Sequence, residues 1–145
     1  MDETANRFVA PLSGAGEVPP VLTFAQGVLE LKIDWEHQAV HYGLHVNGLG
    51  GITQAHIHLG SPNENGAPVA LVYGPSAATG LVNGPLSQGM FIETDLLNAY
   101  AGDFAGFVQA LRSGHLYINV HTADDPAGTI RGQIGSLTYG PRGKK

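Results

Sequence analysis

Apolar and polar positions alternate in short runs along this chain, and glycine and proline separate the runs. Residues 28–35 and 40–46 show the period of two that is typical of a half-buried strand. Further short runs predict strands at residues 7–12, around His56, and at 69–73, 90–93, 116–121 and 128–137. Regular short strands with such turns indicate an all-β fold, an antiparallel Greek-key sandwich or barrel of about seven to nine strands.

The same alternation predicts which side chains face the core. Ile57 and the apolar residues of the 116–121 strand are expected inside, because a strand presents alternate residues to opposite faces. Residues 47–51, which are rich in glycine, are expected to form the connection into the strand that carries His56.

One segment has a helical period instead. Four apolar residues recur at spacings of three and four: Phe104, Phe107, Val108 and Leu111. Asp103 is placed to cap the N-terminus of this segment, and Gly114 follows its last turn. We therefore expect one short helix at residues 103–112, packed against one end of the sandwich.

The length and composition fit a single domain. The chain has 145 residues, of which 43% are hydrophobic, enough for a substantial core. We place the domain at residues 7–137 and interpret residues 138–145 as a disordered tail or cloning remnant. No run of about eighteen apolar residues is present, so we expect no membrane insertion.

Charge and cysteine content exclude several classes of function. The net charge is −5 with seven basic residues, which argues against nucleic acid or an anionic membrane as partner. Cysteine is absent, so there is no disulfide, thiolate metal site or thiol nucleophile. The sequence also lacks a Gly-x-Ser-x-Gly elbow, a phosphate loop and a dinucleotide fingerprint. Enzymatic activity is therefore uncertain and would depend on a metal.

Three histidines carry the candidate chemistry. His56 and His58 are two residues apart on a predicted strand, so their side chains share a face with Cα atoms about 6.5–7 Å apart. That spacing lets one nitrogen of each ring reach the same ion at about 2.0–2.1 Å. His121 lies on the polar face of its own strand. We expect two strands to present these three imidazoles from the outer face of the sheet.

The other histidines are weaker candidates. His45 is a possible additional ligand if its strand packs beside the others. His41 is four residues from His45, about 13 Å along a strand, so the two cannot readily chelate one ion. His37 lies in a polar turn, and His115 is about 20 Å from His121 along its strand, so neither is expected at the site.

Several segments, in this order, resemble the CHRD domain, the module that is repeated in chordin. They are residues 12–21, 55–60, 66–69, 117–122 and 128–134, and the resemblance extends over about residues 7–137. It implies a β-sandwich in a periplasmic or secreted, extracellular protein, with the signal peptide expected to be absent from this sequence. It implies no settled activity.

The layout of the histidines is also similar to that of the Cu/Zn superoxide dismutases. By that similarity His56, His58 and His121 would bind copper, and Arg131 would attract anions. Arg131 could equally be a structural donor to loop carbonyls. The zinc-site residues and the cysteine pair of those enzymes have no counterparts here, so superoxide dismutase-like activity is doubtful.

Two functions remain open from the sequence. The first is an extracytoplasmic metal-binding protein, with copper preferred and zinc as the alternative, acting in copper storage, delivery or redox chemistry. The second is an interaction module that binds another protein and whose histidines are structural. Asp124 and Asp125 could orient the ring of His121 as hydrogen-bond acceptors, but their sequence context favours a simple turn.

Overall fold

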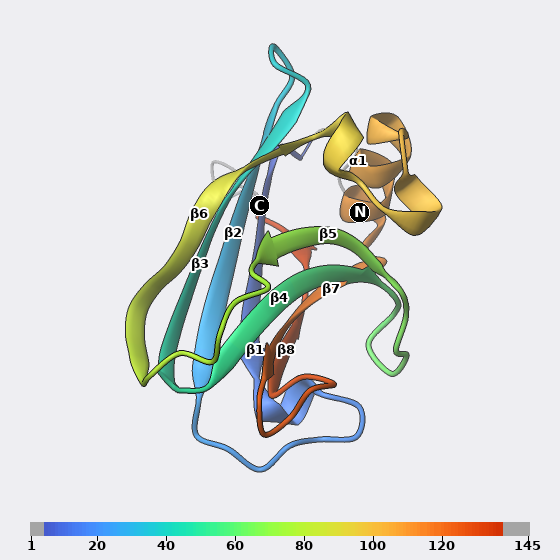
Figure 1. Ribbon diagram of the computed structural model, residues 1–145. Coiled ribbons are helices and arrows are strands. Elements are labelled where there is room, and N and C mark those ends of the chain that lie inside the picture. Colours follow the sequence, from blue (N-terminus) through green and yellow to red (C-terminus); the bar gives the residue numbers. More distant parts are fainter. Residues whose placement is uncertain (1–4, 138–145) are drawn as a thin grey trace, which may run out of the picture.

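The computed structural model describes residues 5–137, which form nine strands and one short α-helix. The predicted all-β fold class is confirmed (Figure 1). The strands are β1 Arg7–Ser13, β2 Gln26–Asp34, β3 Ala39–Leu49, β4 Ile52–Leu59, β5 Pro68–Tyr73, β6 Val82–Ile92, β7 Leu116–Thr122, β8 Ile130–Gln133 and β9 Gly135–Ser136. The helix α1 is Phe104–Ser113, and three short 3-10 helices are η1 Gly14–Gly16, η2 Glu93–Asp95 and η3 Asn98–Tyr100.

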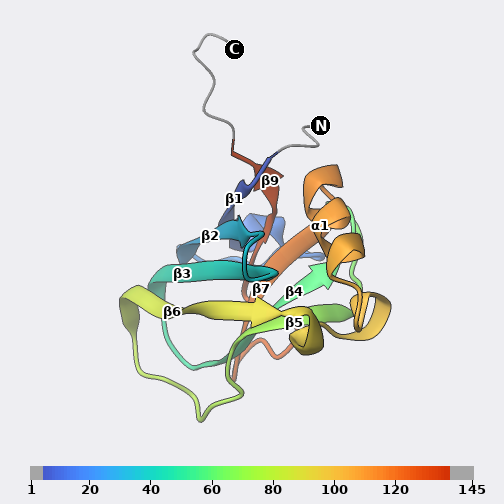
Figure 2. The same cartoon turned by 90° about the horizontal axis from the view of Figure 1, so that it is seen from above.

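All pairings are antiparallel within one sheet, in the order β5-β4-β7-β8-β1-β2-β3-β6, with β9 beside β1. Strands β1, β2 and β3 form a meander, and β6 lies beside β3 although β4 and β5 come between them in the chain, a crossover of the kind found in Greek keys. The sheet curls until its edge strands meet, where Ser87 Oγ on β6 donates to the Val72 carbonyl on β5 at 2.8 Å. The result is a nearly closed barrel rather than two separate sheets (Figure 2).

The inner face of the barrel is apolar, as the alternation predicts. The side chains expected in the core are fully buried: Ile57, Leu116, Ile118 and Val120. Helix α1 begins and ends as expected, since the Asp103 side chain accepts from Gly106 N and Gly114 adopts the left-handed conformation. Phe107 packs on Phe91 of β6 with ring centroids 5.5 Å apart, so the helix adds its buried face to the same core.

Some boundaries differ from the prediction. β3 continues to Leu49 because residues 47–49 pair with β6, so the expected connection at 47–51 is reduced to two residues. β6 begins at Val82 rather than near residue 90, and its polar, glycine-containing first half gave no periodic signal. The expected strand at 128–137 is two short strands, β8 and β9. The predicted tail at 138–145 lies outside the described residues.

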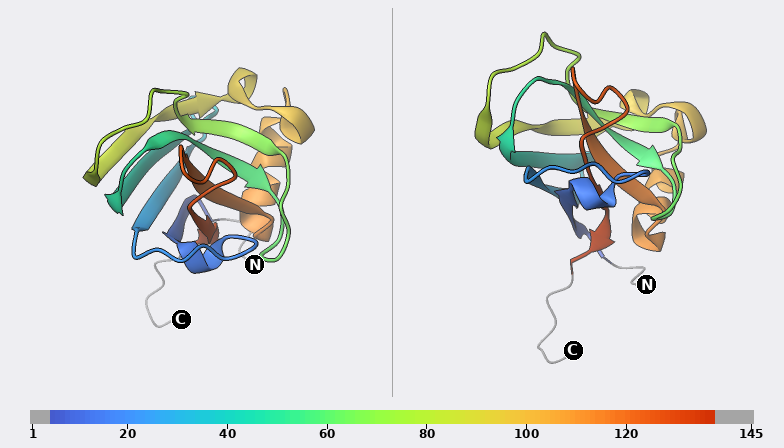
Figure 3. Two further views of the ribbon diagram at one scale, coloured as in Figure 1. Left: turned by 60° about the horizontal axis from the view of Figure 1, so that its bottom comes forward. Right: turned by 90° about the horizontal axis from the view of Figure 1, so that it is seen from below.

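The outer face of the barrel has two different halves. On β2, buried and exposed residues alternate strictly, so its outer side chains face water. On β7 all seven residues are buried, because loops cover the outer side of β4, β7 and β8. These loops are residues 14–25, 60–67 and 123–129 (Figure 3). The outer face of this half, on which the three histidines were expected, is therefore covered by loops and largely closed to solvent. Among the described residues, no helix is long and apolar enough to cross a membrane.

Candidate metal centre

The three histidines lie on adjacent strands and on one face of the sheet. In the β4–β7 register, His56 pairs with Asn119, His58 with Tyr117 and Gln54 with His121. Directly opposed residues share a face, so both histidines of β4 lie on the side that carries His121. The pairing of β4 with β5 is irregular between Ala55 and His56 and again beside His58. Such bulges change the direction of side chains locally.

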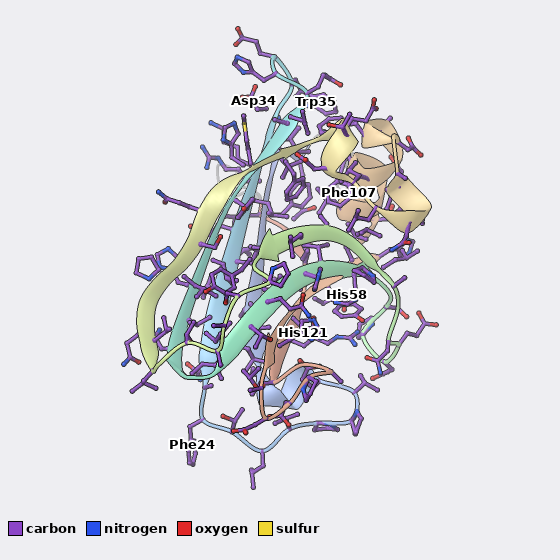
Figure 4. The ribbon with its side chains drawn as sticks, viewed as in Figure 1. Phe24, Asp34, Trp35, His58, Phe107 and His121 are labelled. Atoms are coloured by element: carbon purple, nitrogen blue, oxygen red, sulfur yellow. The ribbon has the colours of Figure 1, made fainter. Side chains whose placement is uncertain are left out.

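The rings face one another closely. Their centroids are 5.3 Å apart for His56 and His121, 5.7 Å for His56 and His58, and 5.8 Å for His58 and His121. One ring nitrogen of each lies within 4.8 Å of the other two. A tetrahedral ion with metal–nitrogen bonds of 2.0–2.1 Å separates its ligand nitrogens by about 3.4 Å. Side-chain rotations that shift the ring nitrogens by little more than about 1 Å would therefore bring them to that spacing. Figure 4 shows His58 and His121 together, far from Asp34.

Two backbone carbonyls determine which nitrogens are available. His58 Nδ1 donates to the Gly66 carbonyl and His121 Nδ1 donates to the Pro126 carbonyl, each at 2.8 Å. A carbonyl oxygen only accepts, so in each neutral ring Nδ1 carries the proton and Nε2 carries the lone pair. Both Nε2 atoms, and Nδ1 of His56, are buried with no hydrogen-bond partner among residues 5–137. Unsatisfied buried nitrogens are costly, and a bound metal ion would satisfy nitrogens of this kind on three clustered imidazoles.

Burial keeps the three imidazoles uncharged. It lowers the pKa of His56 to about 4, with further lowering by repulsion from protonated His121 and His58. Burial also lowers the pKa of His58 and that of His121, although their carbonyl partners oppose the shift. Neutral imidazole is the form that binds metals. The rings are therefore ready to act as ligands at pH 7.

The structure keeps the other histidines away from this cluster. His45 is exposed on β3, opposite Val28 of β2 and Pro85 of β6, and lies outside the cluster. His37 and His41 both bond Asp34 Oδ2, at 2.8 and 3.0 Å. His115 is exposed and lies just before β7. The cluster thus contains the three histidines that strand geometry singles out, without the possible fourth.

Arg131 and Asp125 have structural roles here. The Arg131 guanidinium donates to Asn65 Oδ1 at 3.0 Å and to the Ser61 carbonyl at 2.9 Å, and lies 3.4 Å from the centre of the Tyr117 ring. It is 2% exposed, so it holds the 60–67 loop rather than facing anions in solvent. Asp125 closes a turn, because its carbonyl accepts from Gly128 N, and the acceptor for His121 is Pro126 instead.

Sequence reasoning missed the acidic residue of this layer, Glu17. It is 5% exposed, and burial raises its pKa to about 7, opposed in part by Asn119 and Arg131. It comes directly after η1, where a side chain on Gly16 would collide with the Arg131 carbonyl, so glycine lets this loop lie against β8. The glycine-rich Ser13–Gly16 stretch was the available signal, but alone it indicates only a tight turn.

The comparisons with known proteins agree with the fold. The profile of the CHRD domain matches residues 8–134, which is most of the chain. No curated protein gives a significant match. The matched range contains every residue of the three-histidine cluster and all three loops that cover it.

Proposed function

We propose that this chain, which belongs to the CHRD domain family, binds one metal ion through His56, His58 and His121. Two observations about the same three rings carry the proposal. One nitrogen of each ring lies within 4.8 Å of a nitrogen of the other two, and each ring has a buried nitrogen without a hydrogen-bond partner among the described residues. If the histidines were merely structural, their nitrogens would be expected to bond to protein groups, as the Nδ1 atoms of His58 and His121 do.

Copper is the preferred ion and zinc the alternative. The cluster offers imidazole nitrogen alone, which suits both ions, and the general affinity order favours Cu(II). Met90 lies opposite His41 on β6 and is 55% exposed, so it supplies no sulfur to the cluster. Three imidazoles leave a coordination position open. The CHRD match supports a place outside the cytoplasm. For the ion bound there we propose a role in copper storage, delivery or redox chemistry.

The chain's own residues hold and orient the site. The Gly66 and Pro126 carbonyls hold the rings of His58 and His121 through Nδ1, so that Nε2 is the nitrogen left to bind an ion. Tyr117 stacks on the His58 ring with centroids 4.9 Å apart, and the loops exclude water from both rings. A bound ion would supply Lewis acidity or, as copper, one-electron chemistry.

A second candidate function is an interaction module for another protein. Its support is the 14–25 loop, on which the side chains of Leu22 and Phe24 are fully exposed. Figure 4 shows Phe24 on this loop, away from His58 and His121. Large exposed apolar side chains gathered on one loop are typical of contact surfaces. This function is compatible with metal binding, since Leu22 and Phe24 take no part in the cluster.

The test is metal binding by untagged protein. We expect one equivalent of Cu(II) to bind tightly and to raise the unfolding temperature, because the ion binds the native state only. Replacing His56, His58 or His121 by alanine should weaken binding by more than about a hundredfold, beyond the usual loss for an outer-layer residue. His45→Ala is the matched control, with one imidazole removed from an exposed position.

Full copper-induced stabilisation of His121→Ala would contradict the three-histidine site. The interaction module would then be the better account, and a variant with Leu22 and Phe24 replaced by serine would become the next experiment.

A further inference from the structure

Asn119 occupies the centre of the polar face that carries the three histidines. On β7 it is two residues from His121, and across the β4–β7 ladder it is directly opposite His56. Directly opposed residues have Cβ atoms about 4.5–5.5 Å apart, and residues two apart on a strand share a face. His58 is the next residue of β4 on the same face. The short side chain of Asn119 therefore lies beside all three histidine positions.

The covering loops determine which way the Asn119 amide points. Its nitrogen donates to the Ala127 carbonyl at 3.1 Å. The same nitrogen lies near Glu17, because a side chain on Gly128 would collide both with it and with Glu17 Oε2. The nitrogen is thus directed toward the loops, and the oxygen, on the other side of the same planar group, is directed away from them.

The Asn119 oxygen lies beside the ring of His58. Burial lowers the pKa of His58, and the Asn119 side chain is one of the groups that oppose this shift, so the two side chains are close. His58 Nδ1 already donates to the Gly66 carbonyl, which leaves Nε2 for Asn119. Both Nε2 and Asn119 Oδ1 are buried and have no hydrogen-bond partner among residues 5–137. Each carries a lone pair when the ring is neutral, so they cannot bond to each other and need the same kind of partner.

We propose that Asn119 Oδ1 is the fourth ligand of the ion bound by the three-histidine cluster. The inference rests on the proposed metal site and supplies its remaining donor. An ion between Oδ1 and Nε2 of His58 satisfies two buried atoms at once. Amide oxygens serve as weak fourth ligands in copper sites, and an oxygen donor favours Cu(II) over Cu(I), which prefers sulfur.

The other candidate donors suit the fourth position less well. Gln54 lies opposite His121, but it is only partly buried, and no atom of its amide is both buried and without a partner. Gln133 Oε1 is such an atom, but the Gln133 nitrogen donates to the Gly60 and Gly114 carbonyls, near the start of β7 rather than its His121 end. Among the described residues, no carboxylate belongs to the cluster of ligand atoms.

Carbon-13 NMR of the side-chain amides tests the proposal in the unaltered protein. One equivalent of Zn(II) should shift the amide carbon of Asn119 together with the Nε2 resonances of His58 and His121, because coordination draws electron density from the amide oxygen. The amide carbon of Gln54 should stay unchanged. Shifted histidine nitrogens with an unmoved Asn119 carbon would overturn this proposal alone, assign Oδ1 to ordered water and leave the three-histidine site in place. Unmoved histidine nitrogens would overturn both.

Two matched variants extend the test to copper. Asn119→Leu removes the oxygen and keeps the approximate size, so it should weaken Cu(II) binding by about tenfold and change the hyperfine splitting in the Cu(II) electron paramagnetic resonance spectrum. Gln54→Leu removes an amide from the same face and should change neither. A spectrum of Asn119→Leu identical to that of the parent would contradict the proposal, because a purely structural asparagine alters stability and not the coordination of the ion. If Asn119→Leu fails to fold, the Zn(II) experiment on the parent decides.

Discussion

In both halves of the barrel, alternate residues of a strand point inward and outward, but the outward residues have different surroundings in the two halves. On β2 the outer side chains face water, and exposed residues alternate with core residues without interruption. On β7 the outer side chains are polar but buried, under loops that run across them. Tyr117, Asn119 and His121 occupy this covered face together with Arg131 of β8. The outer surface of β2 should thus tolerate substitution, whereas the buried polar side chains on β7 need particular partners.

Burying polar groups is costly unless each finds a partner. In the covered layer, most polar side chains form hydrogen bonds with loop carbonyls and amides, as Arg131, His58 and His121 do. The groups left without partners in the described chain include the three ring nitrogens, Glu17 Oε2 and Asn119 Oδ1. Most of these groups lie at or beside the histidine cluster, where we place the metal ion.

The largest effect is expected at Arg131. Arg131→Ala removes the donors to Asn65 and Ser61 and the guanidinium from the Tyr117 ring. We expect a loss of about 2–4 kcal/mol in the free energy of unfolding, because buried acceptors lose their charged donor. Urea unfolding measures it. The control Lys32→Ala, on the exposed half, should change stability by less than about 0.5 kcal/mol, and equal losses in the two variants would erase the distinction between the halves.

A smaller effect is expected at the metal ligands without metal. His58→Ala loses the bond to Gly66 and the stack on Tyr117, so the metal-free domain should lose about 1–3 kcal/mol. On an open outer face the loss would be near zero, as we expect for His45→Ala. Thermal or urea unfolding of the parent and both variants, in the presence of a chelator, measures these losses of stability. A metal-free His58→Ala as stable as its parent would show that the covering loops contribute little.

The smallest effect is a difference in pH dependence. His56 has a native pKa of about 4, against about 6.5 when unfolded, so its contribution to stability is lost as pH falls through this window. Glu17 has the opposite sign, because its native pKa of about 7 exceeds the unfolded value, so its contribution is lost as pH rises from about 4.5 through 7.

Glu17→Gln removes only the second contribution. The stability lost between pH 7.5 and pH 5 should therefore be larger in Glu17→Gln than in the parent, as measured by urea unfolding at both values. A loss of the same size in both proteins would mean that Glu17 titrates normally in the native state.

The sequence predicts the inner face better than the covered one. Alternation identifies Ile57 and Val120 as core residues, and the spacing of His56 and His58 places both rings on one face. Alternation cannot reveal that loops will cover that face, because a polar residue has the same pattern whether water or a loop lies above it. The carbonyls of Gly66 and Pro126, which orient two rings, carry no side-chain signal at all.

The pairing of strands that lie far apart in the chain could not be predicted from the sequence either. β6 begins with a polar, glycine-containing segment that pairs along β3, so its position depends on a partner far away in the chain. Glu17 acquires its raised pKa from burial under a fold that brings residues 17, 119 and 131 together. Such proximity follows from topology rather than from local sequence.

The account depends most directly on the protonation of the histidine rings, which long-range proton–nitrogen NMR reports. In the metal-free protein at pH 7, His58 and His121 should carry their proton on Nδ1 and leave Nε2 bare, because each Nδ1 donates to a carbonyl. One equivalent of Zn(II) should shift both Nε2 resonances and those of His56, while His45 stays unchanged. Protonated Nε2 atoms in the metal-free protein, or zinc shifts confined to His45, would contradict the three-histidine metal site.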